Sequence, residues 1–511
     1  MAYKKDDIVE LDITDLGTGG EGIGRADGYT VFVKDALIGD RVEAKIIKAK
    51  KNYGYGRLTK IINPSNNRIE PRCSVARQCG GCQIQQMSYK AQLDFKRELV
   101  KGNLERIGGF TGDNSLKVLP VIGMDSPFNY RNKAQYPVGT NKNGEIIMGF
   151  YAGRTHSIID NIDCSIGASE NVFILQNIKT WMEENNIPAY DENNHTGLVR
   201  HVLIRTGFTT GQIMVCLVIN ADGIKSDLSK KLVDKLLAID FTGIKTQAGI
   251  RYNENLAKRN AVANQVDNDL KIRDIVEFDG KAKISSIMIN VNKKDTNVIL
   301  GEKSKTLYGN DYIIDYIDDI KFQISPLSFF QVNPIQTEVL YGKALEFADL
   351  SGGETVWDMY CGIGTISLFL AKKAKEVYGV EIVPQAIEDA KNNAKINNIC
   401  NANFYVGRAE EVVPDFYNND SSADKLQDAK HPDVVVVDPP RKGCDEVLLN
   451  TLIKMAPNRL VYVSCDSATL ARDLKKLSEN GFKIEKVQPV DMFPHTVHVE
   501  TVCLMSRVKE K

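Results

Sequence analysis

The fold of this chain is best predicted from one segment, Thr355-Val-Trp-Asp-Met-Tyr-Cys-Gly-Ile-Gly-Thr365. An apolar run ends near Asp358, Gly362 and Gly364 follow, and a run typical of a helix begins at Thr365. In open α/β sheets, a glycine turn between a strand and a helix lets the backbone come close to a bound ligand. The segment therefore predicts a parallel sheet with a ligand site at the carboxyl end of this strand.

Strands and helices alternate from about residue 325 to the end of the chain. The expected strands are 355–360, 376–381, 403–406, 433–438 and 459–464, and the expected helices are 365–374, 384–397 and 468–480. Two further strands close the chain, and the polar stretch 417–430 reads as a surface insertion. The alternation predicts an α/β fold with a doubly wound, Rossmann-like sheet.

Two other units precede this sheet. Short alternating runs separated by glycine turns in the first 60 residues predict a small, OB-like β-barrel. The middle of the chain reads as a mixed α+β domain. We therefore expect a barrel at 1–60, a central α+β domain at 61–87 and 117–325, and a catalytic α/β domain at 88–116 and 326–511.

Charge is distributed unevenly along the 511 residues. The net charge is only -1, but Arg41 to Phe110 holds fifteen Lys or Arg against five Asp or Glu. Tyr53 and Tyr55 lie between basic residues of the barrel. Basic side chains interleaved with aromatic rings suit single-stranded nucleic acid, because rings stack on bases and charges follow phosphates. The alternative is an ordinary barrel with a solvated lysine-rich edge.

Nothing in the sequence indicates a membrane or a secretory route. No apolar run approaches the roughly 20 residues that cross a bilayer, and the first residues, Met1-Ala-Tyr-Lys-Lys, lack an apolar signal core. We expect a cytoplasmic protein without membrane association. No pattern implies an obligate protein partner, so we expect a monomer.

The cofactor loop favours a nucleoside ligand without phosphates. Glu381 ends the strand that follows Gly362 and Gly364, where a carboxylate can hold both ribose hydroxyls. The third glycine of the dinucleotide fingerprint is missing, and Ser367 stands there. S-adenosylmethionine fits this pattern. The alternative is a glycine turn that serves packing only.

Cys465 is the candidate nucleophile. It follows the apolar strand 459–464 and precedes a helix, at the sheet edge where α/β enzymes place their chemistry. Carbon 5 of uracil becomes nucleophilic when a thiolate adds at carbon 6, so a cysteine suits methylation of that ring. Cys361 is a rival thiol inside the cofactor loop. The alternative for Cys465 is a buried small hydrophobe.

Glu500 is the candidate base. After methyl transfer, a base must remove the proton of carbon 5 before the thiol leaves. His495 and His498 precede Glu500 and suit orientation of its carboxylate or contact with phosphate; each also suits a structural role. Asp438, fixed by Pro439 and Pro440 at a strand end, can accept bonds from a base edge or from the cofactor. The Pro-Pro motif does not choose the acceptor atom.

Four cysteines suggest a metal site. Cys73, Cys79, Cys82 and Cys164 offer the four thiolates that a [4Fe–4S] cluster needs. Zinc also accepts four thiolates, usually from paired hairpins. The irregular spacing favours iron–sulfur, and we expect a structural or RNA-orienting role for it.

Together these motifs resemble the bacterial RNA uracil-5-methyltransferases, specifically the iron–sulfur branch that modifies 23S ribosomal RNA. The resemblance spans nearly the whole chain, including a barrel similar to a TRAM domain, the four cysteines and the motifs 328–333, 358–364, 438–441, 463–466 and 498–500. It implies S-adenosylmethionine and a [4Fe–4S] cluster as cofactors and 23S ribosomal RNA as partner. It implies a pocket lined by Gln331, Tyr360, Thr365, Glu381 and Asp438, with Cys465 as nucleophile and Glu500 as base.

Two departures from the family pattern affect individual contacts. Asp466-Ser467 replaces the Asn-Pro that often follows the nucleophile, and Thr365 replaces a polar amide of some relatives. Two other functions stay open. One is a uridine C5-methyltransferase acting on transfer RNA, and the other is a catalytically silent RNA-binding assembly factor that keeps the fold.

Overall fold

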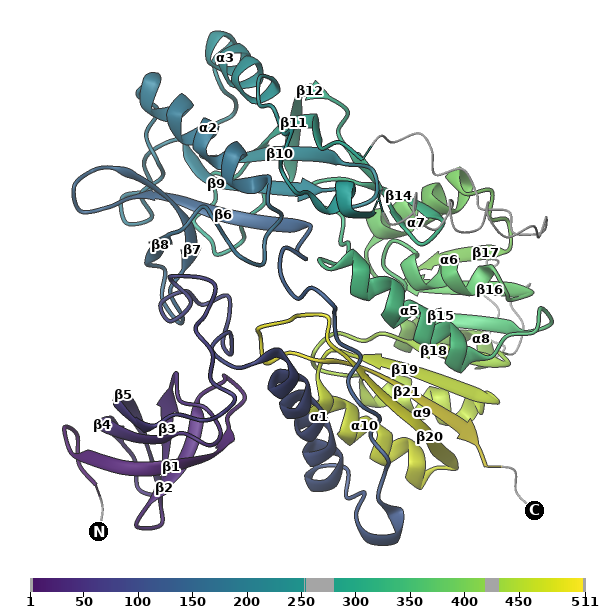
Figure 1. Cartoon of the computed structure of the whole chain (residues 1–511). Coiled ribbons are helices and arrows are strands. Elements are labelled where there is room, and N and C mark those ends of the chain that lie inside the picture. Colours follow the sequence, from purple (N-terminus) through teal and green to yellow (C-terminus); the bar gives the residue numbers. More distant parts are fainter. Residues whose placement is uncertain (1–2, 252, 254–279, 419–431, 509–511) are drawn as a thin grey trace.

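The computed structural model describes residues 3–251, 253, 280–418 and 432–508 (Figure 1). The polar stretch 417–430 lies almost wholly outside the described residues. Three units are visible: an N-terminal barrel, a central domain and a C-terminal α/β domain (Figure 1).

The N-terminal unit is a closed five-stranded barrel with strand order β1-β2-β3-β5-β4. Its strands are β1 (Ile8–Leu16), β2 (Gly22–Ala26), β3 (Tyr29–Lys34), β4 (Arg41–Ala49) and β5 (Tyr53–Asn63). Residues of β1 alternate between exposed and buried, so Val9, Leu11 and Ile13 fill the interior. This period of two is what a half-buried strand requires, and the predicted barrel is confirmed.

The central domain is built on a seven-stranded sheet with order β12-β11-β10-β9-β6-β7-β8. The elements are β6 (Lys133–Thr140), β7 (Ile146–Tyr151), β8 (Ile158–Asp160), α2 (Asn171–Glu184), β9 (Val199–Thr206), β10 (Gln212–Ile219), α3 (Ser226–Leu237), β11 (Lys283–Val291) and β12 (Lys303–Gly309). Helices α2 and α3 bury Trp181 and Leu232 against this sheet. A two-stranded ribbon of β13 (Ile313–Ile317) and β14 (Ile320–Ile324) leads into the next domain.

The C-terminal domain is a seven-stranded sheet with order β17-β16-β15-β18-β19-β21-β20. The elements are α5 (Pro334–Ala348), β15 (Thr355–Met359), α6 (Thr365–Ala371), β16 (Glu376–Glu381), α7 (Pro384–Ile396), β17 (Ala402–Val406), α8 (Ala409–Asn418), β18 (Val434–Val437), α9 (Glu446–Met455), β19 (Arg459–Ser464), α10 (Ser467–Glu479), β20 (Phe482–Val490) and β21 (Glu500–Arg507). Strands β15 to β19 pair in parallel, while β21 runs antiparallel to β19. The predicted Rossmann-like fold is confirmed.

Both faces of this sheet are buried, which explains its unbroken apolar strands. In β18, Val434 and Val436 belong to the core beneath α5, α6 and α7. Val435 and Val437 belong to the opposite core, beneath α9 and α10. Helix α1 (Tyr89–Arg106) joins that second face and packs beside α10 (Figure 1). A segment from early in the chain thus completes the C-terminal domain.

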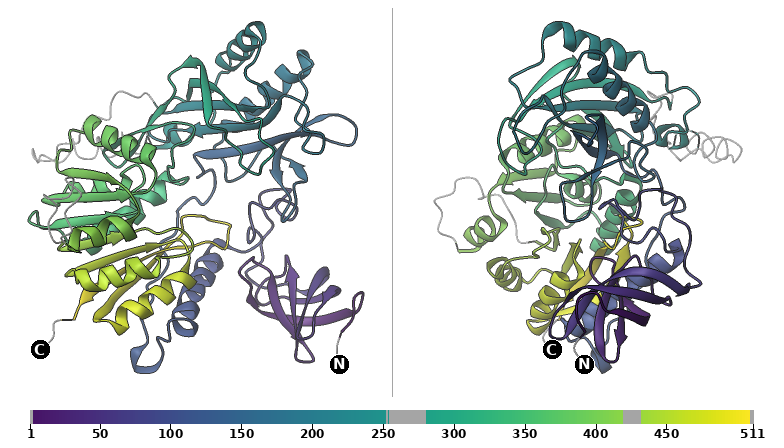
Figure 2. Two further views of the ribbon diagram at one scale, coloured as in Figure 1. Left: turned by 180° about the vertical axis from the view of Figure 1, so that it is seen from behind. Right: turned by 90° about the vertical axis from the view of Figure 1, so that its left-hand side faces the viewer.

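The barrel lies at one side of the molecule (Figure 2), and its side chains contact both other units. Leu16 and Leu37 of the barrel share an apolar cluster with Phe95 of α1 and with Val497, which lies between β20 and β21. Arg154 of the central domain pairs with Glu21. Within the described residues, no helix is long and apolar enough to cross a membrane.

Candidate active site

The loop after β15 is shaped by three positive φ angles. Tyr360 has φ of 68°, Gly362 of 54° and Gly364 of 82°. A non-glycine residue in this region is strained and is enriched at functional sites. The Cys361 N–H donates to the Val380 carbonyl at 3.0 Å, which fixes the loop against β16. The turn ends at Gly364, where α6 begins.

Asp358 and Ser367 support this loop from below. Asp358 is fully buried and accepts a hydrogen bond from the Ser367 hydroxyl. Burial raises the pKa of Asp358 to about 7, with the neighbouring Asp438 and Glu381 adding to the shift. Ser367, at the place of the missing third glycine, thus has a structural role of its own.

Glu381 is oriented by two backbone N–H groups. Its carboxylate accepts from Gly362 at 3.2 Å and from Val383 at 3.0 Å. The carboxylate is therefore held beside the glycine turn, where each oxygen keeps a further lone pair for a ligand. This placement suits a ribose-binding carboxylate, and that role of Glu381 stays a prediction.

A cavity of about 980 Å³ opens at the carboxyl ends of these strands. It brings together seven of the predicted site residues: Gln331, Tyr360, Gly362, Glu381, Asp438, Cys465 and Glu500. They come from the ends of β15, β16, β18 and β19, from the start of β21 and from the segment before α5. A volume of this size matches pockets that hold a cofactor-sized ligand with part of a second one.

Cys465 and Glu500 share the inner part of this lining. Burial, together with the charges of Glu500 and Asp438, raises the pKa of the half-buried Cys465 thiol to about 11. Burial also raises the pKa of Glu500 to about 8, assisted by Asp438 and opposed by Arg441. Strongly shifted pKa values in one cavity indicate a catalytic site.

Asp438 is a further acid of the cavity. Desolvation raises its pKa to about 7. Near neutral pH, protons on Asp438 and Glu500 reduce the negative charge around Cys465. Because that charge opposes formation of the thiolate, the protonated acids make the thiol easier to ionise.

Three residues of the cofactor motif do not line the cavity. Gly364 and Thr365 are absent from the cavity lining, and the Thr365 hydroxyl is 3.1 Å from the Tyr341 hydroxyl. The contact of Thr365 with a ligand stays a prediction. Cys361, the rival thiol, is buried, with Sγ 3.8 Å from the Gly362 carbonyl oxygen, and does not line the cavity.

The cavity also contains residues to which the sequence assigned no role. Phe329 and Leu327 line it with 72% and 54% of their surface exposed. Exposed apolar side chains at a cavity mouth indicate a ligand-contact surface. Asp389 lines the wall and accepts from the Ser328 hydroxyl at 3.2 Å. The available signal was Phe329 itself, because it lies in the motif 328–333, between β14 and α5.

The four cysteines of the predicted metal site line a second, smaller cavity. Cys73, Cys79, Cys82 and Cys164 surround about 310 Å³ together with Arg131 and Lys133. Backbone and side-chain donors also face the sulfurs, among them Gly81 N–H at 3.3 Å from Cys79 Sγ. All ten cysteines of the described chain are free. The donor set fits an anionic thiolate centre, because cations and N–H groups stabilise negative charge.

These thiols do not converge on one point. Among the described residues, no group of three or more His, Cys, Asp or Glu is arranged to hold a single metal ion. A single-ion zinc site of the tetrahedral kind is therefore not preformed in this part of the chain. The [4Fe–4S] cluster remains a prediction.

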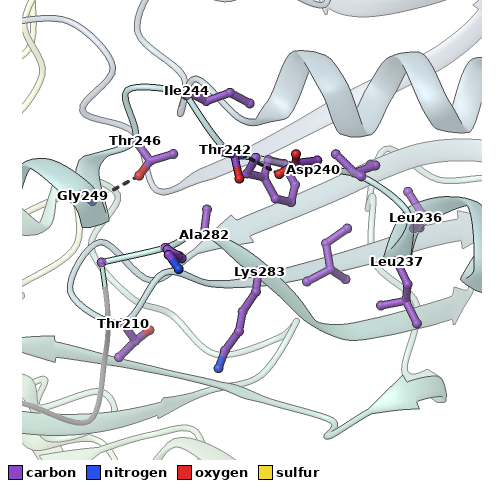
Figure 3. Close-up of a pocket in the computed structure, with 16 residues that line it drawn as sticks. Thr210, Leu236, Leu237, Asp240, Thr242, Ile244, Thr246, Gly249, Ala282 and Lys283 are labelled. Carbon is purple, nitrogen blue, oxygen red and sulfur yellow. Dashed lines mark hydrogen bonds between the residues drawn. The ribbon is translucent and has the colours of Figure 1, made fainter.

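A further cavity lies in the central domain near α3 and β11 (Figure 3). It measures about 670 Å³, and its ionisable lining among the described residues is Asp240, Lys281 and Lys283. Asp240 accepts the N–H of Thr242 at 2.8 Å and so serves the local turn (Figure 3). The lining described here contains no thiol and no acid pair, so we assign no chemistry to it.

The features described so far are those of a methyltransferase. They are the α/β sheet, the cofactor loop, and a thiol and a carboxylate that line one cavity. The family model described as tRNA (Uracil-5-)-methyltransferase matches residues 208–508, and that of the TRAM domain matches residues 6–59. The chain belongs to the tRNA (uracil-5-)-methyltransferase family and is an RNA methyltransferase with an N-terminal TRAM domain.

Relatives match over full length. A protein of Clostridium tetani named as an uncharacterized RNA methyltransferase is 48% identical over 100% of this chain and 99% of the relative. One of Halalkalibacterium halodurans, named likewise, is 47% identical over 98% and 97%. The crystal structure of Pyrococcus abyssi tRNA (uracil-54, C5)-methyltransferase with S-adenosyl-L-homocysteine matches with a TM-score of 0.69 and 27% identity, covering 97% of this chain and 100% of that one.

Proposed function

We propose that this protein methylates carbon 5 of uridine in 23S ribosomal RNA, through a covalent adduct between Cys465 and carbon 6 of the ring. The observation that carries the proposal is the cavity that Cys465 and Glu500 line together with Glu381, which ends β16 beside the cofactor loop. A nucleophile, a base and a cofactor carboxylate are the groups that this reaction needs in one place.

S-adenosylmethionine would supply the methyl group. Glu381 would hold its ribose, and Gly362 would allow close approach to the turn. The exposed side chains of Phe329 and Leu327 would cover its apolar surface. The Pyrococcus abyssi structure contains S-adenosyl-L-homocysteine, which is the product of such a transfer.

Each residue of the pair has one task on the ring. The Cys465 thiolate forms a bond to carbon 6, and the ring electrons move toward carbon 5. After carbon 5 has gained the methyl group, the Glu500 carboxylate takes its proton. The electron pair of that C–H bond restores the double bond between carbons 5 and 6, and the C–S bond breaks to return the thiolate.

A route for the RNA leads from the barrel to this cavity. A groove of about 630 Å³ is lined by Phe32, Lys48 and Tyr55 of the barrel and by His498, two residues before Glu500. The rings of Phe32 and Tyr55 lie 5.6 Å apart. Such a platform with exposed lysines suits stacking of unpaired bases.

The four-cysteine cavity supports the iron–sulfur part of the proposal through its chemistry. In a [4Fe–4S] cluster each cysteine binds its own iron, so the sulfurs surround the cluster and need not meet at one point. Arg131 and Lys133 in the lining would offset its negative charge. This cluster would hold the segment 73–82 against the central domain.

Transfer RNA is the second candidate substrate. The Pyrococcus abyssi enzyme acts on tRNA, and its match over 97% of this chain is too extensive to leave out the barrel. The presence of a barrel therefore does not by itself separate ribosomal from transfer RNA substrates. What favours 23S ribosomal RNA is the resemblance, through the four cysteines, to the iron–sulfur branch of the family.

Mapping 5-methyluridine in a deletion strain tests the substrate. Ribosomal and transfer RNA are purified separately, digested and analysed by mass spectrometry, with a strain that regains the gene as control. We expect one or more 5-methyluridines to disappear from 23S ribosomal RNA. Loss from transfer RNA alone would transfer the activity to the second candidate, and loss from neither would favour the silent assembly factor.

A further inference from the structure

Glu500 stands at the end of a long connection between β20 and β21, residues 491–499. Val490 pairs with Glu500 across the two strands, so Glu500 is the first residue after the connection. Phe493 of the connection lines the catalytic cavity beside Glu500. The conformation of this connection therefore contributes, with the pairing of β21, to where the carboxylate of Glu500 lies.

The first five backbone carbonyls of the connection each accept a hydrogen bond from a residue outside it. The side chain of Gln336 donates to Asp491, that of Asn333 to Met492, that of Lys96 to Phe493 and that of Tyr130 to Pro494, each at 3.0 Å. The backbone N–H groups of Gln83 and Ile84 donate to the carbonyl of His495 at 3.0 and 3.1 Å. Buried backbone groups need such partners, and here they come from four separate parts of the chain.

His495 is the point where the cysteine segment meets the connection. Gln83 and Ile84, which donate to its carbonyl, follow Cys82 directly. Its backbone N–H donates to Gln92 Oε1 at 2.9 Å, and its ring Nδ1 lies 3.1 Å from Gln92 Nε2. One amide of α1 thus holds both the backbone and the ring. His495 has φ of 68°, an uncommon conformation that the surrounding contacts must maintain.

The ring of His495 makes a second link to the cysteine segment. It stacks on Phe128 with ring centres 4.3 Å apart and an interplanar angle of 26°. The guanidinium of Arg72, the residue before Cys73, lies over the same Phe128 ring at 4.9 Å. Both the Cys73 end and the Cys82 end of the segment are thereby connected to His495.

We propose that His495 is a positioning residue that fastens the base-bearing connection to the cysteine segment and so holds Glu500 for proton removal. This inference rests on the proposed function, because it takes Glu500 as the base. Cys465 is held by other contacts, between β19 and α10, where the Asp466 side chain caps the helix by accepting from Ala468 and Thr469. Loosening His495 should therefore impair the step that uses Glu500 and spare the step that uses Cys465.

The test compares those two steps in His495→Ala. Attack by Cys465 is measured, in the presence of S-adenosylmethionine, as adduct formation with 23S ribosomal RNA transcribed with 5-fluorouridine. Fluorine takes the place of the proton that the base removes, so the methylated adduct cannot be released. Proton removal is measured as turnover on unmodified 23S transcript. We expect adduct formation within about twofold of wild type and turnover lower by on the order of 10- to 100-fold. A covalent intermediate should accumulate on the unmodified RNA.

His195→Ala is the matched control. His195 also has positive φ, 53°, but lies in the central domain, where its ring contacts Tyr190. It carries a similar backbone strain and should keep normal turnover. His495→Asn tolerates positive φ and can bond the Gln92 amide, so it should recover part of the turnover. If His495→Ala does not fold, His495→Gly gives the same comparison without backbone strain.

Equal losses in both assays would show that His495 has a merely structural role, and this would overturn the proposal. Normal turnover in His495→Ala would overturn it as well. Failure of the proposed function has a different signature. In that case the wild-type protein itself would form no adduct with fluorinated ribosomal RNA.

Discussion

Replacing Glu500 with Gln should change how protein stability depends on pH. Burial raises the pKa of this carboxyl from 4.5 to about 8. One pKa unit corresponds to about 1.4 kcal/mol, so the ionised carboxylate costs the folded state about 5 kcal/mol. The side chain is only 5% exposed, so solvent screens little of this cost.

The sign follows from proton linkage. Below the unfolded pKa of 4.5 the carboxyl is neutral in both states, and its contribution to stability is fully present. As pH rises toward the folded pKa of about 8, only the unfolded state ionises, so wild-type stability falls. Glutamine does not ionise. The free energy of unfolding of wild type relative to Glu500→Gln should therefore fall by up to about 5 kcal/mol across this window.

Urea unfolding at several pH values measures this difference. Trp357 lies in the catalytic sheet, and in a Trp181→Phe background its fluorescence reports on that domain alone. The control is Glu354→Gln, because hydrogen bonding with Ser351 lowers the pKa of the partly exposed Glu354 to about 2. Its effect should appear only as pH falls below 4.5. Parallel pH curves for wild type and Glu500→Gln would show that folding does not raise the pKa of Glu500.

Three further predictions follow from the site and the barrel. Turnover should rise with pH through about 8 as Glu500 loses its proton. Glu500→Gln should instead accumulate a protein–RNA adduct that resists denaturation and is seen on a gel. Normal turnover in that variant would make another group the base. Protein purified without oxygen should contain about four irons per chain, and Cys79→Ser should lose them in elemental analysis, whereas stoichiometric zinc would contradict the cluster. Replacing the exposed Lys48, Lys50 and Lys51 with Ala should lower the slope of log affinity for ribosomal RNA against log salt by up to about two to three, and an unchanged slope would make these lysines a solvated surface.

Local signals in the sequence were sufficient for the sheet and for most of the site. The strand 376–381 and the strand 459–464 coincide with β16 and β19, because apolar runs bounded by charged or polar residues leave little freedom of register. Cys465 and Glu381 could be assigned to one cavity because parallel strands place their carboxyl ends at one edge. Helix α6 is shorter than expected and ends at Ala371.

Long-range packing was beyond the sequence patterns. Thr365 lies in the first turn of α6, and the position of Tyr341 on α5 determines which way its hydroxyl points. The buried ion pair between Lys96 and Asp491, at 2.5 Å, joins residues almost at opposite ends of the chain. No local pattern predicts such a partner, and the burial of this pair is what fixes α1 against the connection 491–499.

The most direct test of the proposed covalent mechanism is the identity of the cysteine that attacks the RNA. Wild-type protein is incubated with S-adenosylmethionine and 5-fluorouridine ribosomal RNA, and the trapped adduct is digested and located by mass spectrometry. Cys465→Ala and Cys361→Ala serve as the paired variants. We predict an adduct on Cys465 that disappears in Cys465→Ala and persists in Cys361→Ala. An adduct on Cys361, or one that survives in Cys465→Ala, would contradict it.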